Sequence, residues 1–167
     1  MTETGKQENE AGFSFSGISG RTGTGAISLV TKVPNPIKGA VKMSDFQSLG
    51  NDKYGRVPPI LLAGKAADQF CRDHEFFDET WDIAPKSRKS FQKYRKMISN
   101  QSEDEDEPKA KIVKSTDTVG AVGILIDGDE IQTVSGSSSG GLLMKRNGRI
   151  GSASTNGAGF WADKASC

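Results

Sequence analysis

The sequence of 167 residues predicts a single α+β domain. Short apolar runs of strand length are separated by segments with helical periodicity, and an apolar hairpin pattern follows a long polar stretch. Hydrophobic residues make up 34% of the chain and the mean hydropathy is −0.50, so the core is expected to be modest.

The first half of the chain predicts two strands and a helix between them. Residues 26–33 alternate like a strand, which Pro34 and Pro36 end. Pro36 suits the first turn of a helix over residues 37–47. Residues 60–63 are apolar and predict a second, short strand.

Two more helices are expected after this strand. Residues 65–74 have a helical apolar pattern that places Cys71 in the core. Residues 86–98 predict a basic helix with Phe91 and Ile98 on one face.

The last predicted elements are the two strands of a hairpin. Residues 118–126 alternate or run apolar, which predicts a buried strand, and residues 131–135 return beside it. Residues 127–130 form the turn, where Gly128 supplies permissive backbone. Thr118 stands at the start of the first strand.

Charge limits the classes of partner. The formal net charge is +1, so no strong bulk attraction to nucleic acid or to an anionic membrane is expected. Residues 86–96 carry six Lys or Arg and no acid, whereas residues 103–107 are all acidic. A solvated basic helix followed by an acidic linker explains this pattern, and a nuclear-import patch on the helix is the alternative.

Cysteine, histidine and hydropathy patterns indicate an intracellular protein without a metal or cofactor. Cys71 and Cys167 lack the spacing of a redox or zinc motif, and His74 is the only histidine. No apolar segment has the length of a membrane span, and the N-terminus lacks an apolar signal core. We therefore expect a cytoplasmic or nuclear location.

Thr118 is the residue with the most chemical promise. A threonine hydroxyl becomes a good nucleophile when its own α-amine is free to take its proton, which requires cleavage of the bond after Asp117. A Ser/Gly turn over residues 137–141 and a Gly-Arg-Ile-Gly loop over residues 148–151 follow in order. This order indicates an enzyme that makes its active site by self-cleavage.

Six motifs in the same order carry a family resemblance. They lie at residues 35–37, 56–64, 117–122, 138–141, 148–151 and 157–162. With them the chain resembles the type-2 asparaginase group of N-terminal-nucleophile hydrolases, and within it the threonine aspartases (taspases). The resemblance implies a four-layer αββα sandwich, of which this chain holds only a part.

The resemblance also implies roles for individual residues. Thr118 is the nucleophile and, after cleavage of the Asp117–Thr118 bond, the first residue of a β subunit. Ser139 matches a second active-site hydroxyl that hydrogen-bonds the nucleophile. Arg149 matches an arginine that binds a substrate carboxylate, for which its planar fork is suited. Gly151, in the same loop, is expected to allow close approach of the backbone.

Two departures from the small-molecule asparaginases favour an endopeptidase that cuts after aspartate. Asp117 replaces the usual glycine before the nucleophile. Ser152 replaces an aspartate that, in the relatives, holds the α-amine of free asparagine or of a β-aspartyl peptide. An asparaginase or β-aspartyl hydrolase is the first alternative, and a non-catalytic remnant is the second.

The resemblance covers the middle of a complete family member, because two segments typical of the family are not in this chain. It divides the chain into four parts: a disordered or loop-rich tail at 1–24, the end of the α-subunit part at 25–98, a flexible linker at 99–117 and a truncated start of the β-subunit part at 118–167. The implied partners are a protein substrate with an aspartyl residue at the cut and a second processed αβ unit in a homodimer.

Overall fold

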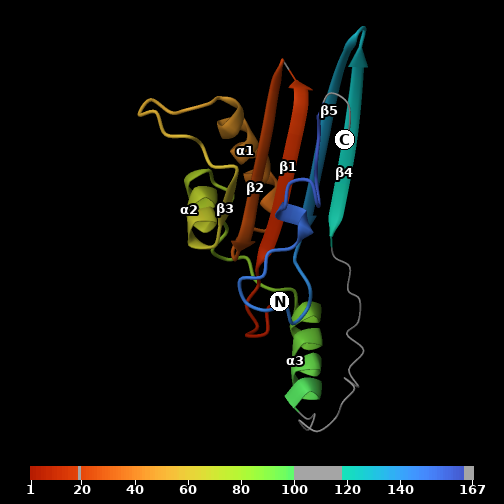
Figure 1. Ribbon diagram of the computed structural model, residues 1–167. Coiled ribbons are helices and arrows are strands. Elements are labelled where there is room, and N and C mark those ends of the chain that lie inside the picture. The colour runs from red at the N-terminus through yellow and green to blue at the C-terminus, as the bar shows by residue number, and fades with distance from the viewer. Residues whose placement is uncertain (19, 100–117, 164–167) are drawn as a thin grey trace.

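The computed structural model describes residues 1–18, 20–99 and 118–163 (Figure 1). The elements, in chain order, are β1 (Asn9–Ile18), β2 (Arg21–Val30), α1 (Pro36–Ser48), β3 (Leu61–Ala63), α2 (Lys65–Asp73), α3 (Pro85–Ser99), β4 (Val119–Asp127), β5 (Glu130–Ser139) and the 3₁₀ turn η1 (Ser152–Ser154). The three expected helices and the expected hairpin are thus present, with ends that differ from the predictions by a few residues.

One mixed sheet organises the described residues. Its strand order is β3-β2-β1-β5-β4, and every neighbouring pair is antiparallel except β2 and β3, which are parallel. β1 is the central strand, and it joins the β2–β3 half of the sheet to the β4–β5 hairpin. The fold class is therefore α+β, as the sequence predicts.

The expectation of a disordered or loop-rich tail over residues 1–24 is wrong. This stretch forms β1 and the first part of β2, and most of β1 is buried. Phe13 and Phe15 give β1 one apolar face, but its other face carries Gly12, Ser14 and Ser16. The small residues on that face are buried by close packing against the C-terminal segment, which their own hydrophobicity does not reveal.

The helices α1 and α2 cover one face of the sheet. The core cluster on that face consists of Ile27, Val30, Val33, Met43, Ala67 and Cys71, all fully buried. Gly25 permits the contact between β2 and α1, because a Cβ atom there would lie 2.3 Å from the backbone nitrogen of Ser44. The prediction that Cys71 fills the core is confirmed.

The C-terminal segment 151–163 covers the opposite face of β1 and β5. Gly12 makes room for the ring of Phe160, which would clash with any side chain at position 12. Hydroxyl groups fix the segment at several points: Ser137 Oγ donates to the Ala153 carbonyl at 2.9 Å and Thr133 Oγ1 to the Asp163 carbonyl at 2.7 Å. This segment carries η1 in front of the sheet in Figure 1.

The strand expected over residues 118–126 is present as β4, but the expectation that it is buried is wrong. β4 is the edge strand, and Val122 and Ile124 are 67% and 60% exposed. Its apolar side chains have no layer above them among the described residues. An apolar groove between β4 and α1 is lined by Phe13, Ile37 and residues of β4 and β5. The described residues form one sheet, so the second sheet of the expected four-layer sandwich is not among them.

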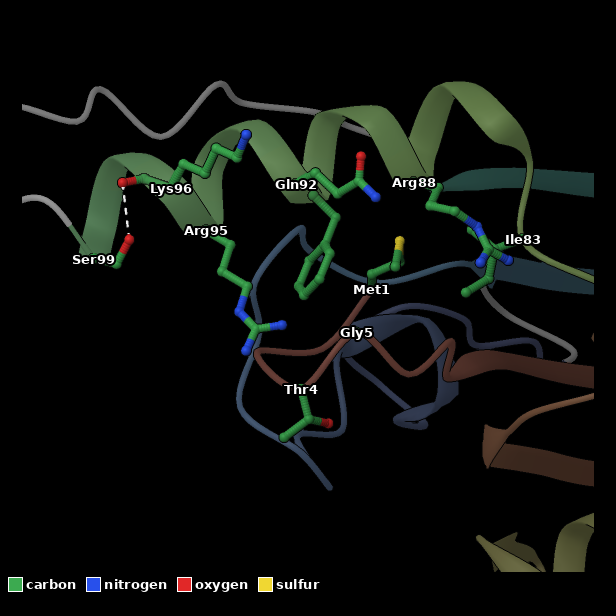
Figure 2. A pocket seen from close by; sticks show the side chains of 10 residues that line it. Met1, Thr4, Gly5, Ile83, Arg88, Gln92, Arg95, Lys96 and Ser99 are labelled. Atoms are coloured by element: carbon green, nitrogen blue, oxygen red, sulfur yellow. Dashed lines mark hydrogen bonds between the residues drawn. The ribbon is translucent and has the colours of Figure 1, made fainter.

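α3 lies beside the N-terminal turn rather than on the sheet (Figure 1). Its one buried residue, Phe91, packs against Gly5. A hollow between the helix and this turn is lined by the basic residues Arg88, Arg95 and Lys96, by polar residues and by apolar residues that include Met1 and Ile83, as Figure 2 shows. The residues that the sequence predicts for the active site do not line this hollow.

No helix within the described ranges has the length and apolar character that a membrane crossing requires.

Candidate active site

The two predicted hydroxyl residues are in contact. Thr118 Oγ1 donates a hydrogen bond to Ser139 Oγ at 3.0 Å. The β4–β5 register produces this contact, because Val119 pairs with Ser138 and the next residues on each strand therefore meet at the end of the ladder. Thr118 itself is exposed, so a substrate can reach its hydroxyl from solvent.

Ser139 is held more firmly than Thr118. It is the last residue of β5 and is buried, and its Oγ also accepts the backbone N–H of Gly141 at 3.0 Å. A hydroxyl oxygen has two lone pairs and can accept both of these bonds. Ser139 is therefore a fixed acceptor that orients the hydroxyl of Thr118.

A buried carboxylate connects this hydroxyl pair to the Gly-Arg-Ile-Gly loop. Glu10 of β1 lies directly opposite Ser139 in the β1–β5 ladder. Glu10 Oε2 accepts the backbone N–H of Gly151 at 2.7 Å. The loop over residues 148–151 and the Thr118–Ser139 pair thus lie at the same end of the sheet, although they belong to separate segments of the chain.

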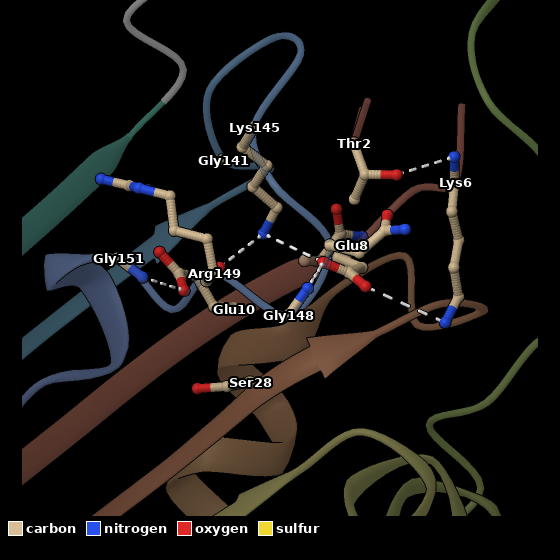
Figure 3. A network of polar contacts seen from close by, with 12 residues as sticks. Thr2, Lys6, Glu8, Glu10, Ser28, Gly141, Lys145, Gly148, Arg149 and Gly151 are labelled. Carbon is tan, nitrogen blue, oxygen red and sulfur yellow. Dashed lines mark hydrogen bonds and ion pairs between the residues drawn. The ribbon is translucent and has the colours of Figure 1, made fainter. Parts of the chain in front are cut away.

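The loop presents Arg149 to solvent. Arg149 is exposed, and Figure 3 shows its guanidinium directed away from the buried groups that hold its backbone. Lys145 Nζ donates to the Arg149 carbonyl at 3.0 Å, and Glu8 Oε2 accepts the N–H of Gly148 at 3.2 Å. An exposed guanidinium on a fixed backbone is suited to bind a carboxylate from solution.

The other two loop residues differ in their surroundings. Gly151 has no room for a side chain, because a Cβ atom there would lie 2.2 Å from Glu10 Oε1 and 3.6 Å from Arg149 Nη1. Ser152 is exposed at the start of η1. Its side chain is a hydroxyl, whereas the family resemblance implies a carboxylate at this position.

Asp117, the other residue of the predicted cleavage site, lies outside the described residues, as does most of the expected linker. Within the part of the chain that the structure describes, no group of three or more His, Cys, Asp or Glu is arranged to hold a metal ion.

Sequence reasoning missed three residues of this region. They are the buried residues Glu8, Glu10 and Lys145, which form hydrogen bonds to the loop. The two glutamates lie in a stretch whose sequence predicts a polar tail, and the sequence around the lysine predicts a solvated side chain. The one available signal is the spacing of Glu8 and Glu10, which places both on the same face of an extended chain.

Thr118 lies directly before β4, Ser139 accepts the hydrogen bond of its hydroxyl, and the exposed Arg149 lies in a loop at the same end of the sheet. This arrangement fits the site of an N-terminal-nucleophile hydrolase. Comparison with protein families agrees, since the family described as Asparaginase matches residues 17–167. The chain belongs to this family of N-terminal-nucleophile hydrolases.

Individual relatives point the same way. The chain is 31% identical over 179 residues to the plant-type L-asparaginase of Pyrococcus furiosus, and 30% identical over 177 residues to that of Thermococcus kodakarensis. Each alignment covers 100% of this chain and 52% of the relative. The isoaspartyl peptidase/L-asparaginase of Rattus norvegicus is 27% identical over 139 residues, which cover 83% of this chain and 36% of the rat protein. The chain thus spans about half the length of the curated relatives that cover it fully.

Proposed function

We propose that this chain carries the nucleophile and the carboxylate-binding arginine of a hydrolase that acts on asparaginyl or β-aspartyl amides. The hydrogen bond between Thr118 and Ser139 is the observation that carries the proposal. The similarity to proteins named L-asparaginase and isoaspartyl peptidase supports this substrate class. Arg149 would bind the substrate carboxylate, and Ser139 would orient the attacking hydroxyl.

The first reaction is self-cleavage. Thr118 Oγ attacks the carbonyl carbon of Asp117, the C–N bond to Thr118 breaks, and the nitrogen leaves as the new α-amine. The acyl group is then an ester on Oγ, which water hydrolyses to free the Asp117 carboxylate and the threonine hydroxyl.

The second reaction repeats this chemistry on a substrate. The α-amine of Thr118 takes the hydroxyl proton as Oγ attacks the amide carbon, and it passes the proton to the departing nitrogen. Water releases the acyl group as a carboxylate. No residue other than Thr118 is needed as general base.

An endopeptidase that cuts after aspartate is the second candidate, and two residues favour it. Ser152 offers no negative charge for the α-amine of a free amino acid. Asp117 means that the chain itself presents an aspartyl bond to the nucleophile. A homodimer of processed units belongs to the same proposal.

Self-cleavage tests the proposal. Purified wild-type protein should yield two fragments divided between residues 117 and 118, identified by mass spectrometry, and Thr118→Ala should remain a single chain. Ammonia release from L-asparagine, cleavage of a β-aspartyl dipeptide and cleavage of an aspartyl polypeptide then separate the two substrate classes. A wild-type chain that stays whole would instead identify a non-catalytic remnant.

A further inference from the structure

We propose that Glu8 and Glu10 are positioning residues that set Arg149 for substrate binding. The inference rests on the proposed function, because it assigns a purpose to the support of an arginine that binds a carboxylate. Both glutamates belong to the N-terminal part of the chain, whereas the loop that they hold is close to the C-terminal end of the described residues.

Glu8 holds the first glycine of the loop. Its carboxylate is buried and accepts the N–H of Gly148 at 3.2 Å. Lys145 Nζ, which is equally buried, lies 3.5 Å from the same oxygen and compensates its charge. Figure 3 shows these groups converging beneath the loop. A buried carboxylate is costly without such partners, so the arrangement has a defined geometry.

Glu10 holds the second glycine. Its Oε2 accepts the N–H of Gly151 at 2.7 Å and the hydroxyl of Ser154 at 3.4 Å. Glu10 is 2% exposed, and the absence of a side chain at Gly151 lets its carboxylate reach the backbone. Hydrogen bonds to an ionised acceptor are about twice as strong as those between neutral groups.

The two carboxylates therefore bracket Arg149. Its backbone is fixed on both sides, at the N–H of Gly148 and the N–H of Gly151, and its own carbonyl accepts the bond from Lys145. The side chains of Arg149 and Ile150 are exposed and give the loop little packing of its own. The position of the guanidinium thus depends on the glutamates more than on apolar contacts.

The pairing of the sheet links this support to the nucleophile. Glu10 faces Ser139 across the β1–β5 ladder, and Ser139 accepts the hydroxyl of Thr118. A shift of Glu10 would therefore change the spacing between the attacking hydroxyl and the carboxylate-binding arginine. Misplacement of a binding group by about 1 Å can cost on the order of 10²-fold in rate.

Binding of L-aspartate to the ¹⁵N-labelled full chain tests this role by NMR. Glu10→Gln and Glu8→Gln should each weaken L-aspartate binding by about tenfold or more, if a small displacement of Arg149 is enough to disturb a bidentate contact. They should also accelerate hydrogen exchange at Gly151 and Gly148, respectively.

Asp68→Asn is the matched control. Asp68 accepts a backbone N–H as the glutamates do, from Thr31 at 3.0 Å, but it belongs to α2 and does not contact the loop. It should lower the melting temperature without changing the affinity for L-aspartate. If a glutamine variant does not fold, Glu10→Asp replaces it. This change keeps the negative charge but shortens the side chain, and it should still weaken L-aspartate binding.

The outcomes separate the two proposals. If wild type binds L-aspartate and the folded glutamate variants bind it equally well, the positioning role is refuted and the proposed function stands. If affinity simply follows melting temperature across all variants, Asp68→Asn included, the glutamates are only structural. If wild type does not bind L-aspartate, the carboxylate-binding role of Arg149 fails, and the inference fails with it.

Discussion

At the scale of single residues, the contact between Thr118 and Ser139 matters most. Two hydroxyl groups from different strands meet at 3.0 Å because the hairpin register brings them together. Ser139 is buried and Thr118 is exposed, so Ser139 is the fixed partner of the pair and Thr118 faces solvent. This division of roles fits a nucleophile that must change partners during catalysis.

Ser139→Ala should slow self-cleavage by about fivefold, because one hydrogen bond contributes about 1 kcal/mol and each 1.36 kcal/mol of barrier is a tenfold change in rate. Conversion of freshly purified precursor to fragments, followed by gel electrophoresis, measures this rate. Ser137→Ala is the control, since that hydroxyl donates to the Ala153 carbonyl and not to Thr118. Equal rates for Ser139→Ala and wild type would rule out the orienting role.

Gly151 is the second informative residue. Its φ of −100° is open to any amino acid, so backbone conformation does not require glycine there. The requirement comes from the Glu10 carboxylate, which occupies the space of a side chain. The Gly-Arg-Ile-Gly pattern is therefore explained at its second glycine by a neighbour from the far end of the sequence.

At the scale of elements, α2 packs against the helix-covered face of the sheet and places a buried thiol in the core. Cys71 packs in the cluster that includes Ile27 and Met43. Burial, and to a smaller extent the charge of Asp68, raises the pKa of the Cys71 thiol to about 12. The thiol therefore stays protonated in the folded chain at neutral pH and acts as a small apolar side chain.

This raised pKa predicts a loss of stability at alkaline pH. The unfolded thiol ionises near its ordinary value of 9.0, whereas the folded one retains its proton. Between these two pKa values the unfolded state binds fewer protons than the folded state. The thiol's contribution to the free energy of unfolding is therefore complete below pH 9 and decreases, by up to about 1.4 kcal/mol per pH unit, as pH rises.

Comparison of wild type with Cys71→Ala isolates the effect, because every other titrating group, Cys167 included, is present in both proteins. Denaturant unfolding at pH 7 and at pH 10 should show a larger decrease for wild type. Parallel decreases in the two proteins would show that burial of the thiol does not control this pH dependence.

At the scale of the whole molecule, the most unusual feature is the exposed edge strand. β4 presents Val119, Val122, Ile124, Leu125 and Ile126 to solvent, each more than half exposed. Val122, Ile124 and Ile126 alternate along the strand and therefore share one face, and contiguous apolar patches are rare on soluble monomers. An unpaired apolar edge is also a site for association with other chains.

We expect the isolated chain to bind the dye ANS and to self-associate. The double variant Val122→Lys/Ile124→Lys should reduce both effects, while the free energy of unfolding changes by no more than about 0.5 kcal/mol per site, as for other exposed positions. ANS fluorescence and sedimentation velocity measure the two effects. Gln132→Lys on β5 adds charge without removing an apolar side chain, and should leave ANS binding unchanged; equal ANS binding by all three proteins would contradict the prediction.

Prediction from sequence succeeded where local pattern controls structure. The helices α1, α2 and α3 follow from periodicity and from Pro36, and the hairpin follows from two apolar runs around Gly128. Thr118, Ser139 and Arg149 each lie in a short motif, and their roles in the site stay a prediction. The sequence does not locate the strand β1, since its Gly and Ser residues are buried by neighbours rather than by their own hydrophobicity.

Long-range contacts explain the remaining misses. Glu8 and Glu10 look like solvated charges because their partners lie far along the chain, with Gly151 as many as 141 positions from Glu10. The exposure of β4 was also hidden, because an apolar strand does not reveal whether a layer covers it. Such features depend on the assembled sheet and leave no local signature.

The central position of β1 has a consequence for how the chain is made. The ribosome completes this strand well before its neighbour β5, because the residues that pair, such as Glu10 and Ser139, lie far apart in the sequence. Pairings between such distant segments are slow to form, because a long loop must close before any contact forms. A nascent chain must therefore keep β1 unpaired on that side until β5 has been synthesised, a period in which chaperones can bind it.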